Sequence, residues 1–250
     1  MLEVSRTSQR STYRILAGIA IPVYRMVARI SWRGTENFPA SGGFVVAANH
    51  LTEIDPITVA YPVYKSGIMP RFLAKESLFR VPVLGWLLSH IGMVPVYRGT
   101  TRAKDSLAAA FAELHDGGAI LVYPEGTVTR DPRMWPMRAH TGAARLSLQG
   151  QVPVVPLAHW GDQNVLYRDP QGKRTVNLFP PKKVRVLIGE PLQPRELMRP
   201  GKQPTDQPTA DDLNYATTVI MDRITGLVAQ LRGEEAPESR FDPRARKESS

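Results

Sequence analysis

From residue 43 onward, the chain alternates short apolar runs with longer segments in which apolar residues recur at helical spacing. Such apolar runs are typical of strands buried on both faces, with helices between them covering the sheet. We therefore predict an α/β fold, a single domain over residues 35–232 with a largely parallel or mixed sheet flanked by helices. The predicted strands are 43–48, 71–74, 93–97, 119–124, 152–158 and 183–189, and the predicted helices are one after Asp55-Pro56 and those at 83–91, 102–115, 140–149 and 211–232.

Residues 12–32 have a different pattern, in which apolar residues are mixed with arginine, tyrosine and tryptophan. Pro22 fits the start of a helix, so the segment is predicted to form two short helices with apolar faces and basic rims. Such helices can lie in a membrane interface, where arginines meet anionic headgroups, or they can simply pack on the core of the domain. We assign residues 1–34 to an amphipathic two-helix membrane-docking segment that precedes the domain.

Neither end of the chain predicts a membrane span. The longest apolar stretch near the N-terminus, residues 15–23, is about half of the ~20 residues that cross a bilayer. We also expect no secretory signal peptide, because no long apolar core precedes a small-residue cleavage site. Residues 233–250 are polar and are expected to form a disordered tail.

Composition narrows the classes of function. Of the 250 residues, 42% are hydrophobic and 22% are charged, as in an ordinary globular domain. The chain has no cysteine, which excludes disulfides, thiolate zinc sites and a cysteine nucleophile. Its formal net charge of +9 favours anionic partners, such as an acidic membrane surface or phosphorylated molecules. No nucleic-acid recognition motif accompanies the basic residues, so no nucleic-acid partner is expected.

The first candidate for chemistry is the segment from Asn49 to Asp55, which directly follows the predicted strand 43–48. Reacting groups of α/β proteins usually lie at strand ends. If the chain turns into a helix between them, Asp55 can accept a hydrogen bond from Nδ1 of His50 and leave Nε2 free as a base. This arrangement predicts acyl transfer with a substrate hydroxyl as the nucleophile. The same two residues at this spacing can also mean only a capped helix.

Two further loops carry groups suited to an anion. Arg98 ends a predicted strand, and a guanidinium there would offer several donors to a phosphate. Gly126 and Thr127 follow another strand and would let backbone amides and a hydroxyl approach phosphate oxygens. Glu125 has the wrong charge for a phosphate, so it would bind an arginine or a substrate hydroxyl.

Four sequence blocks, NHLTEID, GMVPVYR, YPEGT and VPVVP, resemble in this order those of the glycerol-3-phosphate and 1-acylglycerol-3-phosphate acyltransferases, the His-x4-Asp superfamily. The resemblance covers about residues 40–160. It implies an O-acyltransferase of phosphatidic acid synthesis, in which His50 deprotonates the acceptor hydroxyl and Asp55 orients His50. The acyl donor would be acyl-CoA or acyl carrier protein, and no cofactor would be required.

The resemblance also implies a site for the acceptor phosphate and a location. The residues expected to bind the phosphate are Arg98, Glu125, Gly126, Thr127, Lys75 and Arg130. The family often places an arginine directly after the threonine of the third block, whereas in this chain Val128 and Thr129 stand between Thr127 and Arg130. At a later position where many members have a lysine, this chain has His140, with Arg138 nearby. The family's N-terminal docking helices favour a peripheral or monotopic protein on the cytoplasmic face of the membrane.

Two alternatives stay open. The acceptor could be another lipid, such as a glycosylated phosphoinositide or an aminolipid, or the protein could be a non-catalytic binder of anionic lipids. The intact pair of His50 and Asp55 speaks against the second alternative. We interpret His90, His115 and His159 as structural or surface histidines, because none of them has a carboxylate partner at a spacing comparable to that of His50 and Asp55. No HExxH or similar spacing indicates a ligand set, so no metal is predicted.

Overall fold

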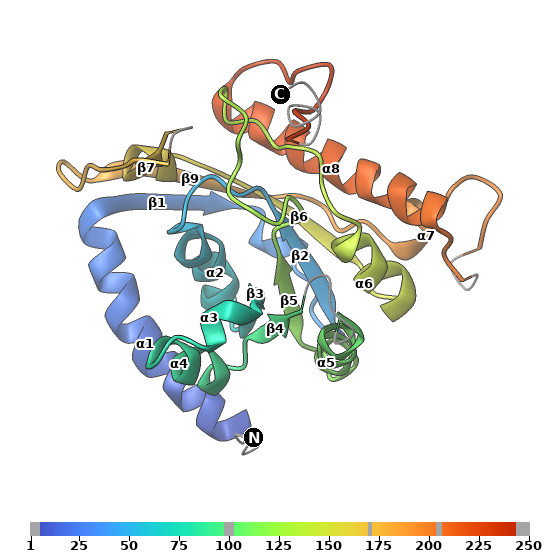
Figure 1. The fold of residues 1–250 in the computed structure, drawn as a ribbon, viewed down its shortest axis with the longest axis horizontal. Helices are drawn as coiled ribbons and strands as arrows, with labels where there is room; N and C mark the ends of the chain where they lie inside the picture. Colours follow the sequence, from blue (N-terminus) through green and yellow to red (C-terminus); the bar gives the residue numbers. More distant parts are fainter. Residues whose placement is uncertain (1–5, 98–102, 170–171, 204–206, 244–250) are drawn as a thin grey trace.

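A mixed sheet forms the centre of the protein (Figure 1). The structure is a computed structural model that describes residues 6–97, 103–169, 172–203 and 207–243. Within these residues the strand order is β1-β9-β6-β2-β5-β3-β4; the last five strands are mutually parallel, and β9 and β1 run the opposite way. The strands are β1 (Ala28–Arg33), β2 (Phe44–Ala48), β3 (Pro70–Lys75), β4 (Val94–Val96), β5 (Ala119–Val122), β6 (Val154–Trp160) and β9 (Lys182–Ile188). A separate hairpin is made of β7 (Leu166–Arg168) and β8 (Arg174–Val176).

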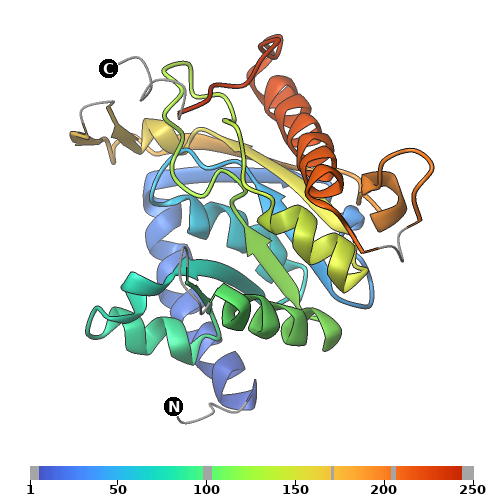
Figure 2. The same ribbon diagram turned by 45° about the vertical axis from the view of Figure 1, so that its right-hand side comes forward.

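Helices cover both faces of this sheet, as the turned view in Figure 2 also shows. Successive residues of β2 face opposite sides, so Val45 and Ala47 belong to one buried cluster, and Val46 and Ala48 to another. The first cluster is covered by α5 (Ala103–His115), α6 (Gly142–Gly150) and α8 (Ala210–Arg232). The other side carries α1 (Arg6–Val27), α2 (Asp55–Lys65), α3 (Glu76–Phe79) and α4 (Leu84–His90), and the short α7 (Pro194–Leu197) precedes α8. The predicted α/β fold, with a mostly parallel sheet flanked by helices, is confirmed, and so are its predicted strands and helices; β1, which lies in the segment 1–34 assigned to membrane docking, also belongs to the sheet.

The prediction of two helices in residues 12–32 is wrong. One helix, α1, runs through Pro22, and β1 follows it directly. Pro22 lacks the amide that would bond the carbonyl of Gly18, but packing of Tyr13 and Tyr24 into buried clusters on either side of it holds the helix together. Beyond the helix the residues alternate between a more buried and an exposed side, which is the period of a strand.

The described part of the C-terminal tail contacts the domain. The amide of Arg138 donates to the carbonyl oxygen of Phe241 over 3.0 Å, and its guanidinium pairs with Asp242 over 2.7 Å. Arg240 pairs with Asp222 of α8. The expected disorder of residues 233–250 stays a prediction, and residues 244–250 lie outside the described residues.

Candidate functional site

His50 and Asp55 meet at the end of β2, where the chain turns into α2. Nδ1 of His50 lies 2.9 Å from Oδ2 of Asp55, so the expected contact is present. The side chain of Asp55 is fully buried, whereas that of His50 is 16% exposed. A proton on Nδ1, donated to the carboxylate, fixes the tautomer and leaves the lone pair on Nε2. Within the described part of the chain, Nε2 has no hydrogen-bond partner.

Asp55 is held by donors from its own loop as well. The amides of Leu51 and Thr52 donate to Oδ2 over 2.5 and 2.9 Å, and the hydroxyl of Thr52 donates to Oδ1 over 2.7 Å. Burial alone would raise the pKa of Asp55, but the charge of His159 and the hydrogen bonds from His50 and Thr52 outweigh it and hold the pKa below its usual range. Asp55 is therefore an ionised carboxylate surrounded by donors.

The loop after β5 positions His50 from the other side. The ring of Tyr123 stacks on the imidazole with centroids 4.1 Å apart and planes at 14°. Glu125 is buried and accepts the amide of His50 at Oε1 over 3.0 Å and the amide of Met137 at Oε2 over 2.9 Å. Burial raises the pKa of Glu125 to about 8. The amide of Thr129 donates to the carbonyl oxygen of His50 over 2.7 Å, so two backbone contacts and one ring contact fix this histidine.

His50 lies on the wall of a cavity of about 990 Å³. This volume is at the upper end of the roughly 300–1,000 Å³ that is usual for ligand pockets. The lining is mostly apolar and comes from the inner side of α1, from α2 and from the segment between β3 and β4; representative residues are Leu16, Ile21, Ala60, Phe72, Leu87 and Met93. The catalytic candidate thus opens onto a large apolar space.

The residues expected to bind phosphate occupy different positions. Lys75 and Gly126 line the cavity, and Gly126 has a positive φ of 73°, which a side chain would strain. Thr127 and Arg130 are exposed outside the lining. Both carboxylate oxygens of Glu125 accept backbone amides, a contact that the sequence did not suggest.

Three other sequence expectations concern this region. Arg98 lies outside the described residues, so its role stays a prediction. Arg138 points to the tail and pairs with Asp242, whereas His140 lines the cavity. Thr129, one of the two residues that precede Arg130, donates its amide to the loop of His50.

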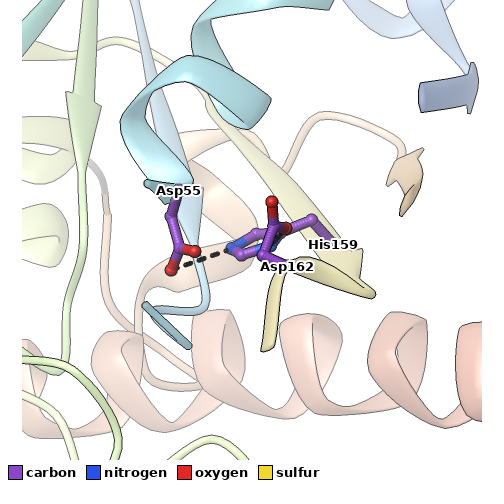
Figure 3. A group of neighbouring side chains, drawn as sticks. All are labelled: Asp55, His159 and Asp162. Atoms are coloured by element: carbon purple, nitrogen blue, oxygen red, sulfur yellow. Dashed lines mark hydrogen bonds and ion pairs between the residues drawn. The ribbon is translucent and has the colours of Figure 1, made fainter. Parts of the chain in front are cut away.

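A buried group behind Asp55 was missed by the sequence analysis (Figure 3). Figure 3 shows His159, at the end of β6, between Asp55 and Asp162. Nδ1 of His159 lies 2.7 Å from Oδ2 of Asp162, and Nε2 lies 3.5 Å from Oδ2 of Asp55. His159 is thus a buried histidine with hydrogen-bond partners, and the sequence analysis missed that two carboxylates contact it. The available signal was Asp162, three residues further along the chain.

Asp55, His159 and Asp162 are residue types that can bind a metal ion, but neither ring nitrogen of His159 is available as a ligand. Ligand atoms of Asp55, His159 and Asp162 lie within 4.8 Å of one another. Nε2 of His159 faces the carbonyl oxygen of Asn49 at 2.8 Å, and Nδ1 faces a carboxylate. Both ring nitrogens are placed to donate, which leaves no lone pair for a metal ion.

Comparison with known proteins shows to which family the chain belongs. A family model described as Acyltransferase matches residues 29–160, which contain all four sequence blocks. The chain belongs to the acyltransferase family. The resemblance inferred from the blocks is thereby confirmed.

Two proteins with similar sequences are both named 1-acyl-sn-glycerol-3-phosphate acyltransferase. A 1-acyl-sn-glycerol-3-phosphate acyltransferase of Bacillus subtilis is 31% identical over 63% of this chain and 70% of its own length. The chloroplastic 1-acyl-sn-glycerol-3-phosphate acyltransferase BAT2 of Brassica napus is 30% identical over 64% of this chain and 44% of its own length. The chain thus spans less than half the length of this plant relative.

A solved structure is similar over nearly the whole chain. The crystal structure of the 1-acyl-sn-glycerophosphate acyltransferase PlsC from Thermotoga maritima has a TM-score of 0.66, covering 94% of this chain and 86% of that one. At 21% sequence identity, the likeness supports the fold.

Proposed function

We propose that this protein transfers a fatty acyl group from acyl-CoA or acyl carrier protein to a hydroxyl of 1-acylglycerol 3-phosphate or glycerol 3-phosphate, as a step of phosphatidic acid synthesis. One observation carries the proposal: among the described residues Nε2 of His50 has no hydrogen-bond partner, and the ring is held by the buried carboxylate of Asp55 on the wall of a large apolar cavity. A base beside an apolar space suits a substrate that joins a reactive carbonyl to a hydrocarbon chain. The names of the relatives support the same reaction.

The proposed reaction needs only a proton shuttle. Nε2 of His50 takes the proton of the acceptor hydroxyl as its oxygen attacks the thioester carbonyl carbon, and the carbonyl oxygen takes up the negative charge. When this tetrahedral intermediate collapses, the C–S bond breaks and the thiolate leaves with the proton from His50. Asp55 stabilises the imidazolium between the two steps. Every atom and electron is accounted for by the two substrates, so no cofactor is required.

We place the acyl chain in the apolar cavity and the phosphate at its polar side. Lys75 and Gly126 lie on the cavity wall, and Thr127, Arg130 and Arg98 are further candidates from neighbouring loops. Glu125 would act through His50, because it holds the backbone of that residue. The net charge of +9 favours an acceptor that carries a phosphate.

The comparison of acceptors tests this function directly. Purified protein is incubated with acyl-CoA or acyl carrier protein and with 1-acylglycerol 3-phosphate, glycerol 3-phosphate, a glycosylated phosphoinositide or an aminolipid. Monoacylglycerol is the matched control, since it differs from 1-acylglycerol 3-phosphate only by lacking the phosphate. We expect its kcat/KM to be at least about tenfold lower, because one lost charged hydrogen bond is worth roughly 1.5–3 kcal/mol. Transfer only to the other lipids would support the alternative acceptors, and transfer to none would support a non-catalytic lipid binder.

We further propose that α1 and the nearby α3–α4 region dock on the cytoplasmic face of the membrane, where anionic lipids are found. The outer side of α1 exposes Ile15, Ile19, Val23 and Met26, whereas its inner side lines the cavity. Leu78, Val81, Val83, Leu84 and Trp86 are also exposed. Within the described residues, no helix combines the length and hydropathy that crossing a bilayer requires. Docking here would bring the cavity to its lipid substrate.

Changing the outer side of α1 should weaken membrane binding. Ile15 and Ile19 are 66% and 62% exposed, so replacing both with serine should leave the fold intact. We expect the double variant to bind vesicles of anionic lipid at least about tenfold more weakly, because inserted apolar side chains contribute roughly 1.5–3 kcal/mol each. Co-sedimentation with vesicles measures this.

The control is Val176→Ser with Leu178→Ser, which removes similarly exposed apolar groups from the β8 end of the hairpin, away from the cavity lining. Its vesicle binding should stay close to that of the wild type. Equal sedimentation of the α1 variant and the wild type would show that docking lies elsewhere.

A further inference from the structure

His159 is a fully buried histidine whose two ring nitrogens both face acceptors. Nε2 lies 2.8 Å from the carbonyl oxygen of Asn49, which can only accept, so this nitrogen carries a proton. Nδ1 lies 2.7 Å from a carboxylate oxygen of Asp162. The backbone reinforces the arrangement, because the side chain of Asn49 exchanges two hydrogen bonds with the amide and carbonyl of His159. The ring is therefore fixed in one orientation with a donor at each end.

The carboxylates around the ring of His159 require the ring itself to be positively charged. Asp55 and Asp162 are both fully buried and both contact the ring of His159, at 3.5 and 2.7 Å. Two carboxylates in a space without solvent repel each other, and a positive ring between them removes that cost. Burial lowers the proton affinity of the ring, but the two carboxylates outweigh it and raise the pKa of His159 to about 9.

The other titratable groups in this region are Tyr24, His50, Tyr123 and Glu125, from three separate segments. Tyr24 and Tyr123 are uncharged at neutral pH, because burial and the nearby carboxylates raise the pKa of both hydroxyls. Burial also raises the pKa of Glu125 to about 8, so that carboxyl favours its neutral form. The two aspartate carboxylates that contact the ring of His159 are thus Asp55 and Asp162.

We infer that His159 is a buried imidazolium that serves as a positioning residue for the catalytic dyad: it holds Asp55 ionised and aimed at His50, and Asp162 in turn holds His159. The role rests on the proposed function of His50 and Asp55. His159 does not line the cavity, so it acts through Asp55 and not on the substrate.

The network continues from Asp162 into α1. The hydroxyls of Tyr24 and Thr58 donate to Oδ1 of Asp162 over 2.9 and 2.5 Å. Tyr24 belongs to the helix that we propose to dock on the membrane, and Thr58 belongs to α2. A continuous series of contacts therefore joins α1 to His50 through Asp162, His159 and Asp55.

A pH profile distinguishes this role from a purely structural one. In His159→Gln the positive charge that holds the pKa of Asp55 low is lost, so the pKa of Asp55 rises. Protonation of Asp55 removes the charge that orients His50, so a higher pKa of Asp55 moves the acid limb of kcat/KM to higher pH. We expect it to shift upward by about one pH unit or more, the usual effect of one close charge. KM should change little, because the cavity wall is untouched.

The matched control is Tyr24→Phe, which removes one hydroxyl from the same network and no charge. Its acid limb should stay at the wild-type position. A His159→Gln variant that is slower at every pH, with an unshifted limb, would overturn the inference. A wild type without acyl transfer would instead contradict the proposed function.

Nitrogen NMR of the wild type tests the charge without any variant. The protein has five histidines. In protein labelled with nitrogen-15 at histidine, the ring with slowly exchanging protons should have both nitrogens protonated at about pH 7.5, above the ordinary pKa of histidine. A neutral ring at His159 at that pH would overturn the inference, whether or not the variant folds.

Discussion

Replacing His50 with alanine should lower the rate of acyl transfer by about 10²–10⁴-fold, the usual contribution of a positioned general base. The structure gives the reason, since Nε2 of this residue is free and opens onto the cavity, whereas its Nδ1 is occupied by Asp55. The fold should persist, because Asp55 keeps the donors of Leu51 and Thr52. The measurement is kcat with the best acceptor of the panel, together with vesicle binding, which should not change.

Two controls make the His50 result specific. His115→Ala removes a histidine whose side chain is 93% exposed, and its activity should match the wild type. Removing the ring of His50 also leaves a space beside Tyr123 on the cavity wall, so free imidazole in the assay should restore part of the activity. Wild-type activity in His50→Ala would show that another group takes the proton.

The strands of the sheet could be predicted because each central strand is buried on both faces and therefore appears as an uninterrupted apolar run, as in β2 and β5. The strand β1 was missed for the opposite reason. It lies at the edge, alternates between exposed and less exposed residues, and was read as a continuation of the amphipathic segment before it. The hairpin strands β7 and β8 are largely exposed and give no apolar signal at all.

The contacts in the candidate site are also of two kinds, those between residues close together in the sequence and those between residues far apart. The contact of His50 with Asp55 is made within one strand-to-helix turn, so its residue types and spacing were enough to predict it. The contacts of Asn49 with His159, and of Tyr24 with Asp162, join residues 110 and 138 positions apart. Such contacts depend on the packing of β6 beside β2 and of α1 against the domain, which no local pattern specifies.

Glu125 shows the limit of assigning a role from a motif. Its place in the third block suggested the acceptor site, yet its side chain is buried and both oxygens accept backbone amides. The carboxyl group of Glu125 accepts the amides of His50 and Met137, which explains why an acidic residue can stand in a loop proposed to bind phosphate. The glycine that follows it does line the cavity.

Replacing Asp55 with asparagine should lower activity about as strongly as loss of the base, because it removes both the charge and the hydrogen-bond acceptor that orient His50. The donors around it are Nδ1 of His50, the amides of Leu51 and Thr52 and the hydroxyl of Thr52, and an asparagine amide would present an N–H group to some of them. We expect kcat to fall by about 10⁴-fold, as when the orienting aspartate of a Ser-His-Asp triad becomes asparagine.

The same substitution should also destabilise the fold. Asp55 is fully buried and lies 3.5 Å from Nε2 of His159, so its loss leaves that ring with one carboxylate in place of two. Breaking a buried charge pair from one side typically costs about 3–5 kcal/mol of unfolding free energy, which urea titration would measure. The control is Asp211→Asn, an exposed acidic residue in the first turn of α8, which should cost less than about 1 kcal/mol. An Asp55→Asn protein that retained both its stability and its activity would exclude Asp55 as the residue that orients the base.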